Sequence, residues 1–143
     1  MEKYGHNLSQ QEFTNHVVMR CLQIFPALTQ YAVEEHVDVR YLELASSPRG
    51  TLTFLISTRD NMLTIGFSAG PGLFDWHFHF LDEPIDEAIE KAFSLIDGII
   101  SGKVILIYSS VLGYFPGDAE DMEGKMKYKE PDEIIELRYW RDL

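Results

Sequence analysis

The fold of this chain is decided by residues 39–80, which read VRYLELASSPRGTLTFLISTRDNMLTIGFSAGPGLFDWHFHF. Apolar and polar residues alternate there with a period of two in four segments, 39–45, 51–57, 62–68 and 73–80. Such alternation is typical of β-strands. The three connections are short and rich in Ser, Pro, Gly, Asp and Asn, residues that favour tight turns. Because tight turns join antiparallel neighbours, we expect a four-stranded antiparallel meander.

A helix is predicted on each side of this stretch. The first begins at Ser9, because residues 9–12 (SQQE) have the form of a capping box, and Pro26 interrupts it. Its apolar face is predicted from residues at helical spacing, which are Phe13, Val17, Cys21, Ile24 and Leu28. The second helix begins at Pro84 and ends near Gly102, a typical C-terminal cap. Its wide apolar stripe consists of Ile85, Ala88, Ile89, Ala92, Phe93, Ile96, Ile99 and Ile100.

Beyond the second helix we expect two further strands and a long loop. The strands cover 104–111 and 134–140, and residues 113–131 between them read as a polar loop. The complete order is then helix, four strands, helix, two strands. This order predicts a single α+β domain over residues 1–143, in which two helices pack on one face of a mostly antiparallel sheet of about six strands.

The composition restricts both the partners and the compartment. The 143 residues include 12 Lys and Arg against 23 Asp and Glu, a formal net charge of −11, and 45% are hydrophobic. This is the composition of a folded protein, and it disfavours nucleic acid and anionic membranes as partners, because both are bound mainly through Lys and Arg. Cys21 is the single cysteine, so we expect no internal disulfide and interpret it as an inert core thiol. No signal peptide or membrane-spanning run is visible, which predicts a cytoplasmic protein.

One strand combines histidines with a carboxylate. In an extended backbone Asp75, His77 and His79 share one face, and this set of side chains could hold zinc or another transition metal. A small metal-dependent hydrolase is therefore one alternative function. No second metal-binding pattern supplies further ligands, however, and the opposite face of Trp76, Phe78 and Phe80 is expected to be core. We therefore favour a solvated or interfacial Asp/His face and expect no cofactor, no bound metal and no catalytic residues.

The negative charge is concentrated in the second half of the chain. Residues 82–143 contain 15 acidic residues against 7 Lys and Arg. Four acids, Glu83, Glu87, Glu90 and Asp97, follow the face of the second helix opposite its isoleucines. A second cluster, which includes Asp118, Glu120 and Asp121, lies in the predicted loop. An ordinary solubilising surface accounts for both clusters, but complementary charge would also steer a basic protein to them.

Three consecutive features resemble small bacterial immunity proteins, which are encoded beside polymorphic or contact-dependent toxins. They are the aromatic-histidine strand FDWHFHF at 74–80, the acidic helix after it, and IISGKVI at 99–105. The resemblance implies a cytoplasmic, non-enzymatic protein that binds and neutralises one cognate toxin domain, which we expect to be basic. We expect the contacts to come from Asp75, His77, His79, Glu83, Glu87, Glu90, Asp118, Glu120 and Asp121. A further alternative is a small-ligand-binding or adaptor module with a pocket between the sheet and the second helix.

Overall fold

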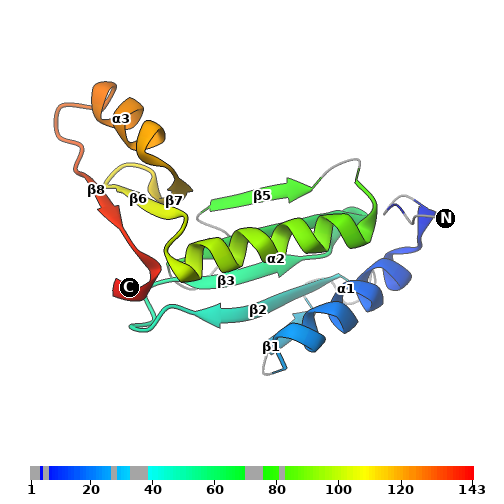
Figure 1. Cartoon of the computed structure of the whole chain (residues 1–143). Helices are drawn as coiled ribbons and strands as arrows, with labels where there is room; N and C mark the ends of the chain where they lie inside the picture. The colour runs from blue at the N-terminus through cyan, green and yellow to red at the C-terminus, as the bar shows by residue number, and fades with distance from the viewer. Residues whose placement is uncertain (1–3, 5–6, 27–28, 33–38, 70–75, 81–82) are drawn as a thin grey trace.

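The computed structural model (Figure 1) describes residues 4, 7–26, 29–32, 39–69, 76–80 and 83–143. The chain is α+β, as the sequence predicts. Its helices and strands are α1 (Gln10–Ile24), β1 (Thr29–Ala32), β2 (Arg40–Ser46), β3 (Thr53–Ser57), β4 (Leu63–Ser68), β5 (Trp76–Phe80), α2 (Ile85–Ser101), β6 (Ile105–Ser109), β7 (Gly113–Gly117), α3 (Ala119–Lys127) and β8 (Ile135–Arg138). Of the helices in the described ranges, none is long and apolar enough to cross a membrane.

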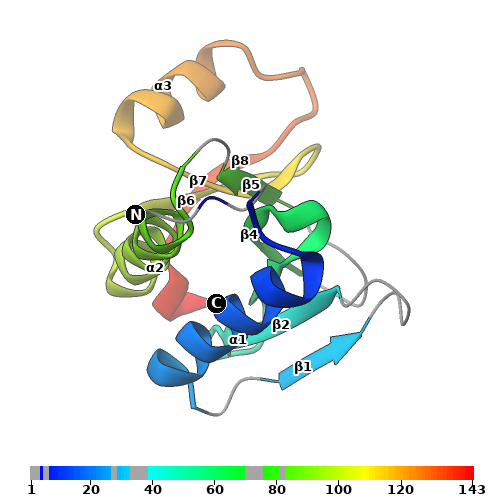
Figure 2. The ribbon, with the colours of Figure 1, turned by 90° about the vertical axis from the view of Figure 1, so that its right-hand side faces the viewer.

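The predicted meander forms the centre of the first sheet. Its strands are all antiparallel, in the order β1-β2-β3-β4-β5, so β1 adds an edge strand that the sequence did not indicate. Leu42 pairs with Ile56 and Ile56 with Ile65, which places these three buried side chains on one face. Both α1 and α2 lie over one face of this sheet (Figures 1 and 2), and the hydrophobic core fills the space between.

The two predicted helices are confirmed, with their predicted caps. At Ser9 the capping box is present in full, because its side chain accepts a hydrogen bond from the Glu12 N–H while the Glu12 side chain accepts one from the Ser9 N–H. α1 stops before Pro26. α2 ends at Gly102, whose φ of 84° is a left-handed conformation that glycine adopts without strain. The apolar stripes are buried except at Phe93, which is partly buried, and at their last turns, where Ile24 and Ile100 are exposed; Leu28 lies outside the described residues.

Cys21 lies at the centre of the α1 contact with the sheet. Its side chain is fully buried. Burial raises the pKa of this thiol to about 12, although the neighbouring Arg20 acts in the opposite direction. The prediction of a core thiol is therefore confirmed.

The second half of the chain differs from the prediction of one sheet and two helices. β6 pairs with β7 and β8 in a separate three-stranded antiparallel sheet, so a single sheet of about six strands is wrong. The polar loop predicted over 113–131 is also wrong, since it contains β7 and a third helix, α3. The Asp118 side chain caps α3 and Lys127 ends it, but α3 has no buried residue. Hydrophobic periodicity therefore gives no signal for it.

The last residues join the two sheets. The predicted strand over 134–140 is shorter, because β8 ends at Arg138 and a single 3₁₀ turn follows at Trp140–Asp142. Trp140 is 3% exposed and stacks on Phe54 of β3, with ring centroids 4.4 Å apart and planes at 23°. The Leu143 carbonyl accepts a hydrogen bond from the Arg49 N–H at 2.8 Å. This contact anchors the second sheet to the turn between β2 and β3.

Candidate partner-binding surface

The outward side of α2 presents acidic side chains on a rigid element. Glu87, Glu90 and Asp97 follow one another at intervals of three and seven residues, which places them on one helical face opposite the buried stripe. All three are exposed, and within the described ranges none of them forms an ion pair. We call these three residues the α2 acidic face.

The other two acids of this region have cationic partners. Glu83 Oε1 lies 3.1 Å from Nζ of Lys91, a residue of α2. Asp86 Oδ1 lies 2.8 Å from His16 Nε2 and 3.7 Å from the guanidinium of Arg20, so Asp86 links α2 to α1. The Asp86 contacts hold the two helices together at the start of α2. Glu83, a predicted contact residue, pairs with Lys91 and so is not part of the α2 acidic face.

The second predicted acidic cluster is the first turn of α3. Asp118 Oδ1 accepts a hydrogen bond from the Asp121 N–H at 2.9 Å, and Asp121 Oδ2 accepts one from the Asp118 N–H at 2.9 Å. The backbone N–H of Asp121 lowers the pKa of Asp118, because it stabilises the charged carboxylate. Glu120 remains exposed. These carboxylates therefore have a structural use as helix caps.

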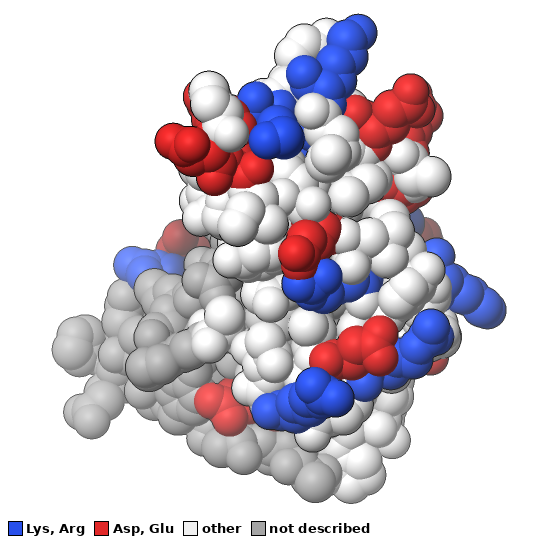
Figure 3. Space-filling model, turned by 90° about the vertical axis from the view of Figure 1, so that its left-hand side faces the viewer, with Lys and Arg blue, Asp and Glu red and all other residues white. Residues whose placement is uncertain are grey.

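The surface around α3 is not uniformly acidic. Lys125 and Lys127 follow the acidic first turn within the same short helix. Figure 3 shows acidic and basic side chains interspersed on this side of the molecule, with no single acidic patch. The lysines of α3 therefore offset part of the negative charge of its first turn.

The predicted Asp75, His77 and His79 face is described in part. Asp75 lies outside the described residues, whereas His77 and His79 are exposed on β5. The two imidazole centroids lie 4.8 Å apart, and His79 Nδ1 lies 2.7 Å from Thr64 Oγ1 on β4. Among the residues that the structure describes, no group of three or more His, Cys, Asp and Glu could hold a metal.

The aromatic side of β5 is only partly core. Trp76 stacks on Phe67 with centroids 5.2 Å apart, but Phe78 is 50% exposed, so the prediction that all three aromatic residues are buried is wrong. The physical reason is that β5 is the terminal strand of its sheet. Its neighbour β4 is buried throughout, whereas β5 is not.

The structure does not bring the predicted contact residues together. Ile65 pairs with Phe78 on the face that α2 covers, so His77 and His79 project from the opposite face. In Figure 1 α3 lies beyond the C-terminal end of α2, whereas Glu83, Glu87 and Glu90 belong to its N-terminal half. The predicted contact residues that the structure describes, a set that leaves out Asp75, thus form three separate surfaces.

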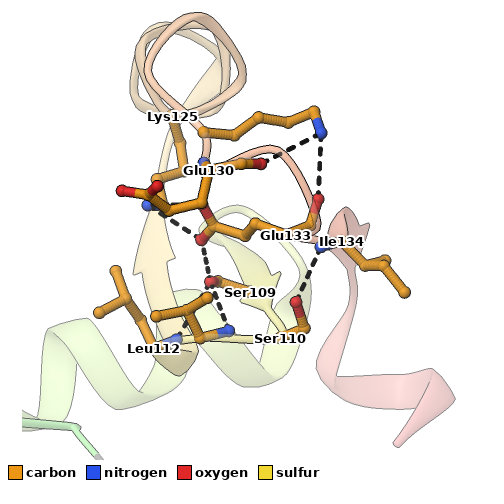
Figure 4. Close-up of polar contacts among 9 residues, drawn as sticks. Ser109, Ser110, Leu112, Lys125, Glu130, Glu133 and Ile134 are labelled. Atoms are coloured by element: carbon orange, nitrogen blue, oxygen red, sulfur yellow. Dashed lines mark hydrogen bonds and ion pairs between the residues drawn. The ribbon is translucent and has the colours of Figure 1, made fainter.

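A buried carboxylate that the sequence analysis missed lies in the second sheet. Glu133 is 4% exposed and accepts hydrogen bonds from the Ser109 hydroxyl and, at 3.0 Å, from the Glu130 N–H (Figure 4). Lys125 Nζ lies 3.0 Å from Oε2, the carboxylate oxygen that also accepts the Ser109 hydrogen bond. These contacts, with the Ser109 hydrogen bond foremost, lower the pKa of Glu133 to about 2. Ser109 is itself buried, so the arrangement ties β6, α3 and the approach to β8 together and offers no open nucleophile.

Two surface hollows lie along α1 and not between the sheet and α2. One, of about 380 Å³, is lined by Asn15, Val18, Met19, Leu22 and Gln23. The other, of about 340 Å³, is lined by Leu8, Glu12, Asn15, His16 and Met19. Nearly all of these side chains come from one helix, so both hollows are shallow features of its surface. Comparisons of the chain with protein-family models, curated proteins and solved structures found no match.

Proposed function

We propose that this protein is a non-enzymatic immunity protein, which binds a basic toxin domain through the α2 acidic face and so blocks the toxin in the cytoplasm. The observation that carries the proposal is the set of three exposed carboxylates without ion pairs, Glu87, Glu90 and Asp97, on a helix fixed by a buried apolar stripe. The resemblance of residues 74–105 to immunity proteins points in the same direction.

The geometry of α2 suits recognition of a cationic surface. Glu87 and Asp97 are ten residues apart, which corresponds to about 15 Å along a helix. Because the backbone of α2 is already ordered by its packing, binding requires little further loss of conformational entropy. The net charge of −11 adds long-range attraction, which increases the association rate of oppositely charged proteins.

The test uses the toxin domain that this proposal predicts to be encoded beside the chain. The double variant Glu87→Lys/Glu90→Lys is compared with Glu123→Lys/Asp132→Lys, whose two exposed acids lie on α3 and on the loop that follows it. Both variants change the net charge from −11 to −7, since each reversal adds two positive charges. We expect the first to reduce the association rate constant by about tenfold at low salt, and the second to have a much smaller effect.

Stopped-flow kinetics at several salt concentrations, together with rescue of cells that express the toxin domain, give the readout. Equal rates for the two variants would show that only global charge matters and would remove the α2 acidic face from the interface. Failure of the unmodified chain to bind the domain or to protect cells would refute the immunity function itself.

A further inference from the structure

The histidine pair on β5 is arranged as part of a metal site. His77 and His79 project from the same side of the strand, and both are exposed. Thr64 Oγ1 lies 2.7 Å from Nδ1 of His79; in the tautomer in which Nδ1–H donates to this hydroxyl, Nε2 is the nitrogen that a metal would bind. Metal-binding histidines characteristically engage their second nitrogen in this way, which fixes the orientation of the ring.

The distance between the rings fits one shared ion. A zinc–nitrogen bond is about 2.0–2.1 Å long, and a ring centroid lies about 1.1 Å beyond its nitrogen, so two imidazoles on one tetrahedral ion have centroids about 5 Å apart. The observed separation of His77 and His79 is 4.8 Å. The spacing of the two rings is therefore compatible with ligation of one ion by both side chains.

Two histidines alone are an incomplete ligand set. Zinc sites in proteins take three or four side chains, and within the described ranges no third His, Cys, Asp or Glu joins the pair. β5 is the terminal strand of its sheet, with Phe78 half exposed. In Figure 1, β7 lies near the Trp76 end of β5, and no described strand follows the rest of its outer edge.

The sequence of β5 is complementary to itself. In WHFHF the residue types are symmetric about Phe78, so two copies paired antiparallel about this residue place aromatic side chains opposite one another. The same register places His77 opposite His79 of the second copy. Residues directly opposite in such a pair have Cβ atoms about 4.5–5.5 Å apart, close enough for all four imidazoles to meet one ion.

We propose that β5 pairs with β5 of a second copy of this chain, and that the two His77 and two His79 side chains together bind one divalent transition-metal ion of the zinc type. This site goes beyond the proposed immunity function and does not depend on it. Pairing would add a strand to the edge of β5 that no described strand occupies, and it would bury Phe78; β5 has no Lys or Pro to block strand addition.

Charge determines when the dimer forms. Each copy has a net charge of −11, so two copies repel one another at low salt, and a divalent cation at the contact offsets part of this repulsion. We therefore expect a monomer without metal and a dimer with it. The ligands are neutral imidazoles, which suit zinc, copper and nickel.

The experiment titrates zinc chloride into the full chain without a His tag. Sedimentation velocity and metal analysis should show that the mass doubles as one zinc binds per two chains. Hydrogen exchange should show new protection of amides in residues 76–80, which identifies β5 as the contact. His77→Gln and His79→Gln should abolish the zinc-dependent dimer, whereas His16→Gln, on α1, should retain it.

Two further variants test the geometry. Thr64→Val should weaken zinc binding about 10–100-fold, because it removes the hydroxyl that orients His79. Phe78→Lys retains both histidines but places two like charges opposite one another, and it should prevent dimerisation. One zinc per monomer, a zinc-induced dimer without protection of β5, or an unchanged dimer in either histidine variant would overturn the proposal.

Discussion

Replacement of Glu90 by lysine should stabilise the free protein. Glu90 follows Asp86 by four residues and Glu87 by three, so it has two like-charged neighbours on α2. Each such pair destabilises a helix by about 0.2–0.5 kcal/mol, and an opposite-charge pair stabilises it by a similar amount. Glu90→Lys converts two repulsive pairs into two attractive ones. These four contributions add up to about 0.8–2 kcal/mol. Because the side chains are exposed and Asp86 already contacts His16, we expect the lower end of this range, about 0.8–1 kcal/mol.

Urea denaturation at low and high salt measures this gain. Glu and Lys have nearly equal helix propensities, and Glu90 lies beyond the first turn of α2, so the substitution isolates the side-chain charge. At about 1 M salt the Debye length falls to about 3 Å, and the gain should largely disappear. Glu90→Gln, which removes repulsion without adding attraction, should give about half the effect. A less stable Glu90→Lys protein, or a gain that persists at high salt, would refute the reasoning.

Two further predictions concern the contacts that hold the second sheet. Trp140→Ala should reduce the free energy of unfolding by about 3–5 kcal/mol in urea, because it removes a buried ring stacked on Phe54, whereas Tyr128→Ala, at a 75% exposed ring, should change it by less than about 0.5 kcal/mol. The pKa of Glu133 is lowered from 4.5 to about 2, so its stabilising contribution is present above pH 4.5 and is lost as the pH falls towards 2. As the pH falls from 4.5 to 2, the free energy of unfolding should therefore decrease less for Glu133→Gln than for the unmodified chain. Parallel plots of this free energy against pH for the two proteins would contradict the prediction.

The elements that the sequence predicts well are those with both periodicity and end signals. α2 combines an apolar stripe with Gly102 at its end, and α1 combines one with the capping box at Ser9. The meander is equally clear, because strand alternation and turn residues agree. By contrast, α3 buries no side chain, so the only sequence signals are its polar ends. The division into two sheets depends on pairings between distant strands, which local patterns do not encode.

The sequence predicts which acidic residues share a helical face, but it does not predict which of the expected contact residues lie on one surface of the folded protein. The spacing of Glu87, Glu90 and Asp97 correctly predicts one helical face, because helix geometry alone fixes it. Whether a carboxylate is free depends on its tertiary neighbours, as Asp86 illustrates through His16. Glu133 is the extreme case, since it lies in a polar segment like many surface glutamates. Only the folding of β6 and α3 around it makes it a buried anion.

The burial of Cys21 makes this thiol a natural probe of how often α1 separates from the sheet. It is the single cysteine of the chain, fully buried, and its pKa of about 12 keeps the thiol protonated at neutral pH. A thiol reagent can therefore modify it only when α1 separates from the sheet. The rate of labelling reports how often this separation occurs in the native state. The same measurement, made on any of the variants above, distinguishes a local release of α1 from global unfolding without an introduced probe.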